Sequence, residues 1–121
     1  MSKILDMELK GLPPTVNHLY RSTRTGRRYK TAFGKLYGDY IALNFMNIWK
    51  AKAYEGPIEL RIKLTASNRR RWDIDNRVKA LQDGLMAGGV IKDDSQVEVL
   101  HVERSYGKCA LTRIEIFTLE Q

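Results

Sequence analysis

Alternation of apolar and polar residues predicts one clear strand, within residues 57–67, PIELRIKLTAS. Every second residue from Ile58 to Leu64 is aliphatic, and the residues between them are charged. A strand with this period of two buries one face and leaves the other in water. We therefore expect this segment to lie in a sheet that has one face in the core.

Weaker alternation predicts three further strands. The first runs from Ile4 to Leu12 and stops at Pro13-Pro14, since proline cannot donate a hydrogen bond to a neighbouring strand. The other two are residues 96–106, QVEVLHVERSY, and residues 109–119, CALTRIEIFTL. A short, glycine-containing connection between two such strands predicts an antiparallel hairpin.

Two other segments have the apolar spacing of amphipathic helices. In residues 33–54, apolar residues recur at i, i+4, i+8, i+11 and i+12, counted from Tyr37. In the second segment, apolar residues recur at helical spacing from Ile74 until Gly88-Gly89, which predicts the helix end.

Residues 17–30, NHLYRSTRTGRRYK, separate the first predicted strand from the first helix. Their Ser, Thr and Gly content argues against a regular element and for a basic loop. The remaining elements follow the order strand, helix, strand, helix, strand, strand. This order predicts a single α+β domain over residues 1–121, with a mixed β-sheet and two main helices.

Composition adds a preference for an anionic partner. The chain has 121 residues, 21 Lys and Arg against 14 acids, a formal charge of +7 and a pI of about 9.7. The single Cys109 excludes an internal disulfide, and one Cys with two His residues gives no zinc constellation. No apolar run approaches the roughly 18 residues of a membrane span. We expect a cytoplasmic protein with no membrane partner.

The positive charge is concentrated in two stretches. Residues 9–38 contain seven Lys or Arg residues and no acid, and an arginine triplet stands shortly before Asp73. A solvated basic face would explain these charges, but the closeness of the triplet to carboxylates favours contacts with a DNA backbone. The expected DNA-binding residues are Arg21, Arg24, Arg27, Arg28, Lys30, Arg69, Arg70 and Arg71.

Asp73 and Asp75 stand two residues apart where the second helix is expected to begin. Helix capping is one explanation, because aspartate readily accepts the free N–H groups of a first turn, but capping needs only one of them. A third carboxylate changes the balance. If residues 88–94 return in an extended conformation, Asp93 or Asp94 comes back beside the helix start.

Three converging carboxylates would repel one another without a cation, and ligation by oxygen alone suits Mg²⁺, with Mn²⁺ as a substitute. A metal held by Asp73, Asp75 and either Asp93 or Asp94 could hydrolyse a phosphodiester by activating water and offsetting charge on the leaving oxygen. Lys79 lies four residues after Asp75. It is either a surface ion-pair partner of Asp75 or a group that stabilises charge on the phosphate.

These residues resemble the RusA-type Holliday-junction resolvases. The resemblance is carried by RRRWDIDNRVKALQDGL at residues 69–85, GVIKDDSQV at residues 89–97 and, more weakly, LPPTVNHLYR at residues 12–21. It extends over nearly the whole chain. One departure is Trp72, because an arginine is expected directly before the first aspartate.

The resemblance implies a homodimeric endonuclease that binds DNA four-way junctions and cuts them by paired, symmetric nicks in recombination and repair. It further implies a bacterial or phage origin. The metal-binding and catalytic aspartates would be Asp73, Asp75 and Asp94, and the essential lysine would be Lys79. A dimer also suits the task physically, because a two-fold axis provides two sites for two strands of like polarity.

The main alternative is a non-catalytic, basic DNA-binding module in which the aspartates only cap helices. A phosphatase or sugar-nucleotide site is disfavoured, because no hydrophobic strand end precedes Asp73 and no supporting Ser or Thr follows closely. Metal-dependent nicking that is lost in an Asp75→Asn variant distinguishes the enzyme from the binding module.

Overall fold

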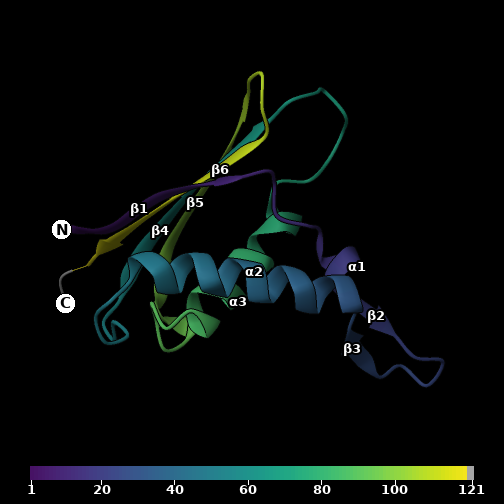
Figure 1. Cartoon of the computed structure of the whole chain (residues 1–121), viewed down its shortest axis with the longest axis horizontal. Coiled ribbons are helices and arrows are strands. Elements are labelled where there is room, and N and C mark those ends of the chain that lie inside the picture. The colour runs from purple at the N-terminus through teal and green to yellow at the C-terminus, as the bar shows by residue number, and fades with distance from the viewer. Residues whose placement is uncertain (120–121) are drawn as a thin grey trace.

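A four-stranded sheet and two helices packed on one of its faces form the body of the chain (Figure 1). The structure is a computed structural model and describes residues 1–119. The expected α+β class with a mixed sheet is confirmed. The elements are β1 (Lys3–Lys10), α1 (Val16–Leu19), β2 (Tyr20–Ser22), β3 (Arg28–Lys30), α2 (Ala32–Ile48), β4 (Ile58–Ala66), η1 (Asp75–Arg77), α3 (Val78–Ala87), η2 (Asp94–Gln96), β5 (Val97–Tyr106) and β6 (Leu111–Thr118).

The sheet has the strand order β1-β6-β4-β5, so the predicted hairpin between the last two strands is wrong. β4 lies between them, antiparallel to β6 and parallel to β5. The connection crosses the end of β4, where the Gly107 amide donates to the Ala66 carbonyl at 3.0 Å. β4 has the most regular buried pattern of the four strands, and it occupies a central position, whereas β5 is an edge strand with mostly exposed residues.

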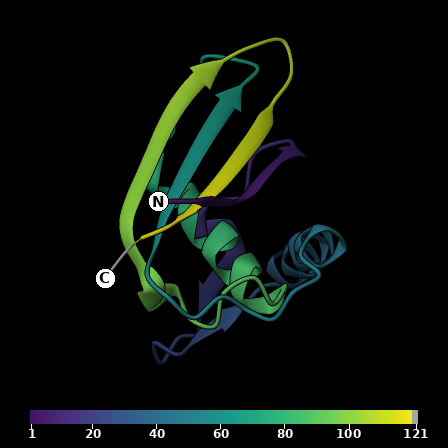
Figure 2. The same cartoon turned by 90° about the vertical axis from the view of Figure 1, so that its left-hand side faces the viewer.

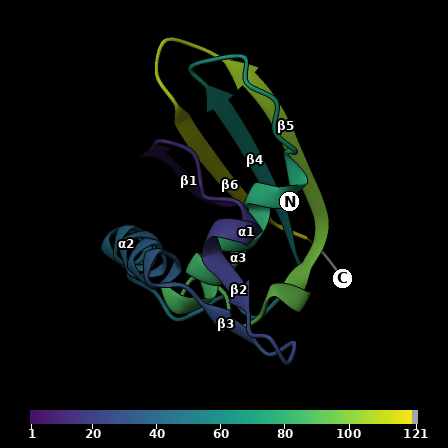
Figure 3. The same cartoon turned by 90° about the vertical axis from the view of Figure 1, so that its right-hand side faces the viewer.

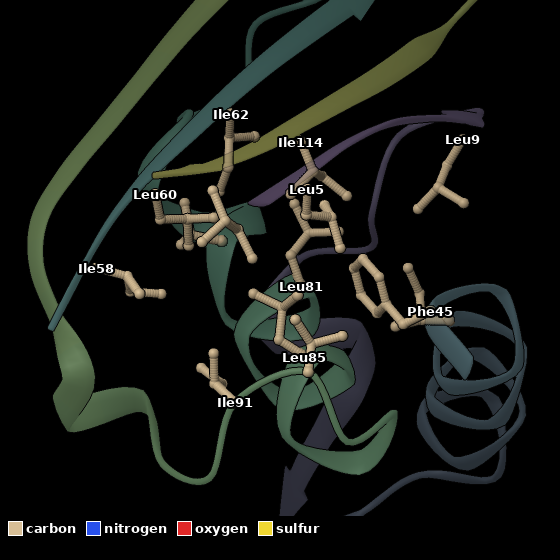
Figure 4. Close-up of a cluster of buried hydrophobic side chains, with 14 of the residues drawn as sticks. Leu5, Leu9, Phe45, Ile58, Leu60, Ile62, Leu81, Leu85, Ile91 and Ile114 are labelled. Carbon is tan, nitrogen blue, oxygen red and sulfur yellow. The ribbon is translucent and has the colours of Figure 1, made fainter. Parts of the chain in front are cut away.

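Only one face of the sheet is covered by helices (Figure 2). On that face, the aliphatic side chains of β4 pack with those of β1 and β6 against α3 and α2 (Figure 4). The opposite face carries charged pairs, including Lys3 with Glu115 at 2.7 Å and Arg61 with Glu59. The alternation read from residues 57–67 therefore separates core from solvent as predicted.

The two helices approach closely at a glycine of α3. A Cβ atom added to Gly84 would lie 1.7 Å from the Cγ2 atom of Ile41, so no side chain fits there. Phe45, Leu81 and Leu85 fill the adjoining core. This contact fixes the position of α3, and thereby the position of the segment that precedes it.

Both predicted helices are present, but α2 ends at Ile48, before the end of the segment 33–54 in which it was predicted. The Thr31 hydroxyl caps α2 by accepting from the Gly34 amide at 2.9 Å. α3 ends at Ala87, and Gly89 follows with a φ of 75°. The Gly89 amide donates to Met86 and the Val90 amide to Leu85, which is the Schellman pattern that glycine at this position favours.

The predicted basic loop of residues 17–30 contains regular structure, so that expectation is wrong. α1 is a single helical turn, and β2 and β3 pair as a two-stranded antiparallel hairpin. Gly26, with a φ of 88°, lies in its turn. This short hairpin has too few apolar residues for a visible alternation, so its pattern was hidden from sequence reasoning.

Two features of the described chain bear on the expectations about compartment and membrane. Cys109 is exposed and is a free thiol. Within residues 1–119, no helix has the combination of length and hydrophobicity that crossing a bilayer requires.

Candidate active site

Asp73 and Asp75 lie in the segment between the end of β4 and α3, and both side chains are exposed. Asp75 is the first residue of η1. The residues in the N-cap positions of η1 and α3 are Ile74 and Arg77, and neither start has a side-chain capping bond. Capping, the structural explanation offered for these two aspartates, is therefore not what they do.

Neither aspartate side chain has another partner within residues 1–119. Among residues 1–119, no hydrogen bond or ion pair reaches the side chains of Asp73, Asp75 or Asp94. Three carboxylates thus remain free to accept from a ligand.

Asp94 begins η2, where its neighbour Asp93 has the capping role. The Asp93 carboxylate accepts from the Ser95 amide at 3.2 Å and from the Ser95 hydroxyl, and it forms a capping box with Gln96. The Gln96 side chain in turn donates to the carbonyls of Tyr54, at 2.7 Å, and Gly56, at 2.9 Å. η2 is therefore fixed beside the start of β4.

The expected convergence of three carboxylates is not seen in the single chain. In the described part of the sequence, no group of three His, Cys, Asp or Glu side chains is close enough to hold a metal ion. The predicted extended return beside the helix start is wrong, because Val90 and Ile91 are buried and Ile91 forms a bridge with Tyr54. The chain follows this core contact to the start of β5 instead.

Lys79 lies on α3 and pairs with a residue that the sequence analysis did not single out. Its ammonium group is 3.3 Å from Oδ1 of Asp83, one turn further along the helix, rather than beside Asp75. The Tyr20 hydroxyl of β2 donates to Oδ2 of the same carboxylate at 3.1 Å. The acidic i+4 spacing of Asp83 from Lys79 was a usable signal for this pair; the Tyr20 contact, 63 residues away, was not.

The expected DNA-binding residues occupy two separate segments on one side of the molecule. Figure 3 shows the hairpin of β2 and β3 below, the loop after β4 above, and α1 with the start of α3 between them. All eight side chains are exposed except Lys30, which is half-buried. Within residues 1–119 none of them forms an ion pair with a carboxylate, so their positive charge is not neutralised locally.

Trp72 holds the arginine-bearing loop against the sheet. The guanidinium groups of Arg104 and Arg77 lie over its indole, 4.6 Å and 5.0 Å from the ring centroid, and Arg104 also donates to the Trp72 carbonyl at 3.0 Å. Arg77 donates to the Pro13 carbonyl at 2.6 Å, and burial lowers its pKa. A tryptophan in this position therefore has a packing role, which its place before Asp73 did not reveal.

The side chains at this site are of the kind that binds a hard divalent cation, but two carboxylates are too few to hold one. Asp73 and Asp75 offer exposed carboxylate oxygens, the donors that Mg²⁺ prefers, and no His or Cys joins them. Cations on both sides could hold a phosphate-bearing ligand over the pair. Among the residues that the structure describes, the site in one chain is therefore a carboxylate pair with basic flanks and no third acidic ligand.

Similarity to known proteins agrees with this chemistry. The family described as Endodeoxyribonuclease RusA matches residues 11–117. The crossover junction endodeoxyribonuclease RusA of Escherichia coli strain K12 is 38% identical over 85 residues, 70% of each chain. The protein of that name from Enterobacteria phage 82 is 36% identical over 85 residues, again 70% of each chain. That of Escherichia coli O139:H28 is 33% identical over 108 residues, 86% of this chain and 89% of the relative.

Proposed function

The chain belongs to the Endodeoxyribonuclease RusA family, and on this basis we propose that it is a metal-dependent nuclease that resolves four-way DNA junctions. The observation that carries the proposal is the pair Asp73 and Asp75, which are exposed and have no capping or ion-pair role within residues 1–119. Shortly before them in the chain stand three arginines that form no ion pair with a carboxylate of the described residues. A fold that only needed capped helices would not leave both carboxylates without a partner.

The proposed cofactor is Mg²⁺, which Mn²⁺ can replace, held by Asp73 and Asp75 together with Asp94. When bound, such an ion would supply an activated water and offset negative charge on the phosphodiester. The protein's own contribution is to hold the DNA backbone in place. Arg69, Arg70 and Arg71 would do so on one side of the carboxylates, and the hairpin cations on the other.

The proposal includes a homodimer, and the structure offers a reason for one. β5 is an edge strand of ten residues, and its Val99 and Leu100 are 43% and 47% exposed. Such an edge favours pairing with a second copy. If two β5 strands pair antiparallel about a two-fold axis, the start of one approaches the end of the other. η2 with Asp94 precedes β5, and Trp72 contacts Arg104 near its end.

A dimer of this kind would bring Asp94 of one copy toward Asp73 and Asp75 of the other. Two sites related by two-fold symmetry would then act on two strands of like polarity, as paired nicking requires. This arrangement also accounts for why one chain alone supplies only two neighbouring carboxylates.

The first test is incubation of the protein with a synthetic four-way junction and Mg²⁺, beside a linear duplex of the same sequence. We expect paired, symmetric nicks in the junction and none in the duplex, and we expect Mn²⁺ to replace Mg²⁺. Binding of the junction with no nicking in either metal would leave only a basic DNA-binding module.

The second test asks whether the site is shared between copies. The variants Asp75→Asn and Asp94→Asn are each expected to be inactive. Mixed and allowed to exchange, they would form heterodimers in which one of the two sites has all its aspartates, and nicking of one strand should return. If mixing restores nothing although exchange is demonstrated, each site is built within one chain.

A further inference from the structure

The side chains of Tyr20, Lys79 and Asp83 form a cluster that joins the basic hairpin to α3. Asp83 is at the centre: Oδ2 accepts from the Tyr20 hydroxyl at 3.1 Å, and Oδ1 is 3.3 Å from the Lys79 ammonium. The Lys79 ammonium also lies 5.7 Å from the centroid of the Tyr20 ring. Each of the three residues therefore contacts the other two.

We propose that Asp83 is a positioning residue. Its carboxylate orients the Lys79 ammonium group toward the DNA backbone, and its bond to Tyr20 couples that orientation to the position of the basic hairpin. The proposal rests on the proposed function, because it takes Lys79 to be the group that stabilises charge on the DNA phosphate. It adds two residues, Asp83 and Tyr20, that act through Lys79 rather than on the DNA.

The geometry of the carboxylate is what fixes the lysine. A lone surface pair between residues four apart on a helix contributes little to stability and leaves the side chains free to rotate. Here the second oxygen of Asp83 is held by a hydroxyl from another element, and the Asp83 side chain is only 22% exposed. With both oxygens engaged, the carboxylate has one orientation, and the ammonium group has a fixed point of attachment.

The Tyr20 hydroxyl is suited to remain the donor in this cluster. Burial is the main cause that raises its pKa, and the neighbouring Asp83 carboxylate raises it further. The hydroxyl therefore keeps its proton at neutral pH and donates to Asp83 rather than repelling it.

Several contacts fix the position of the hairpin of β2 and β3 relative to the Tyr20 side chain. Tyr20 pairs with Lys30 across the two strands, and the Arg28 guanidinium lies 4.5 Å from the Tyr20 ring centroid. At the base of the hairpin, the Thr31 amide donates to the Leu19 carbonyl at 2.9 Å. A backbone phosphate held by the hairpin cations would thus be set at a fixed place relative to Lys79.

The kinetic test uses Asp83→Asn, Asp83→Glu and Tyr20→Phe in the full chain, with a four-way junction and Mg²⁺. We expect Asp83→Asn to lower kcat by about 10- to 100-fold, the range for loss of a group that orients an active-site residue, with KM changed less than about twofold. Tyr20→Phe should lower kcat by a smaller factor. Asp83→Glu, which keeps the charge, should recover part of the loss.

Two comparisons separate positioning from a simple change of charge or fold. Asp39→Asn removes the same charge from a residue that lines the same surface hollow as Asp83 but does not contact Lys79, and it should leave kcat unchanged. The double variant Tyr20→Phe with Asp83→Asn should be no slower than Asp83→Asn alone, since Tyr20 acts through Asp83. Losses that multiply, or an Asp83→Asn variant as fast as Asp39→Asn, would overturn the proposal.

A measurement without substrate keeps this proposal distinct from the proposed function. Hydrogen exchange of the amides of residues 20–30 should become faster in Tyr20→Phe and in Asp83→Asn. The matched control is Tyr29→Phe, since that hydroxyl has no partner in the described chain, and exchange there should not change. If the wild-type protein cuts no junction, the proposed function fails; if exchange is unaltered in the first two variants, the link between hairpin and helix fails.

Discussion

The segment around Asp73 and Asp75 and the segment around Asp93 and Asp94 use the same residue type in opposite ways. In both, two aspartates stand at the start of a short 3-10 turn. At η2, Asp93 caps the turn and forms a capping box with its last residue. At η1, neither aspartate caps anything. One carboxylate is used by the fold, and three remain available to a ligand.

The role of an aspartate in this chain is decided by its hydrogen bonds rather than by its place in a motif. A carboxylate that accepts hydrogen bonds from neighbouring backbone amides stabilises the fold, so its loss lowers the free energy of unfolding. A carboxylate with no partner contributes little to the fold, so its loss should be felt only in ligand binding or catalysis. Stability and activity can therefore be separated residue by residue.

The largest expected effect is in catalysis, at Asp75. Asp75→Asn should lower the single-turnover rate of junction nicking by at least about 100-fold, because an active-site group that stabilises transition-state charge is commonly worth that much. The free energy of unfolding, measured by urea denaturation, should change by less than about 0.5 kcal/mol.

The same pair of measurements on Asp73→Asn provides the internal control. Both variants should bind the junction as tightly as the wild type in the absence of metal, since no basic residue has been altered. A variant that loses stability along with activity would show that the carboxylate belongs to the fold after all.

The next effect distinguishes the two aspartates of η2. Asp93→Ala should lower the free energy of unfolding by about 1 kcal/mol, the usual cost of losing a capping side chain. Asp94→Ala should leave unfolding unchanged, because Asp94 has no partner within residues 1–119. Urea denaturation of both variants measures this directly. Equal losses of stability would mean that Asp94 supports the turn as much as Asp93 does.

Sequence alone predicted those parts of the fold that rest on periodicity. The strand at residues 58–66 and the helix that ends at Ala87 follow from regular apolar spacing and from glycine chemistry. The order of strands in the sheet did not, because β5 and β6 alternate similarly whether they pair with each other or with β4. Pairing is decided by long-range contacts that leave no local signal.

The candidate site shows the same division. The motif placed Asp73, Asp75 and the arginines in one segment, and within residues 1–119 none of these side chains forms an ion pair. The position of Asp94 could not be predicted, since it depends on where Ile91 finds its core contact beside Tyr54. The role of Asp83 could not be predicted either, because it depends on a contact with Tyr20, which is 63 residues away in the sequence.

A smaller effect is expected from the cations beside Asp73. The double variant Arg70→Gln with Arg71→Gln should weaken junction binding and reduce the slope of log K against log salt by about 2, since each phosphate contact contributes about 0.9. Lys63→Gln is the control, because Lys63 lies on β4, away from this segment, and is exposed. Fluorescence anisotropy across a salt series measures both. Equal slopes for the two variants would show that the arginines are only a solvated face.

The smallest effect concerns Asp6, an aspartate that is paired with two cations. Arg113 donates to it through two nitrogens at 3.1 Å and 3.0 Å and Lys3 donates at 3.1 Å, which lowers its pKa from 3.8 to about 2. The native state thus favours the charged form, so this stabilisation is complete above about pH 4 and is lost as the pH falls toward 2. The urea midpoint should fall less steeply across that window in Asp6→Asn than in the wild type. Since the Asp6 side chain lies at the protein surface, 1 M salt should remove most of the difference. A difference that persists in salt would mean that hydrogen-bond geometry, rather than charge, joins β1 to β6 at this point.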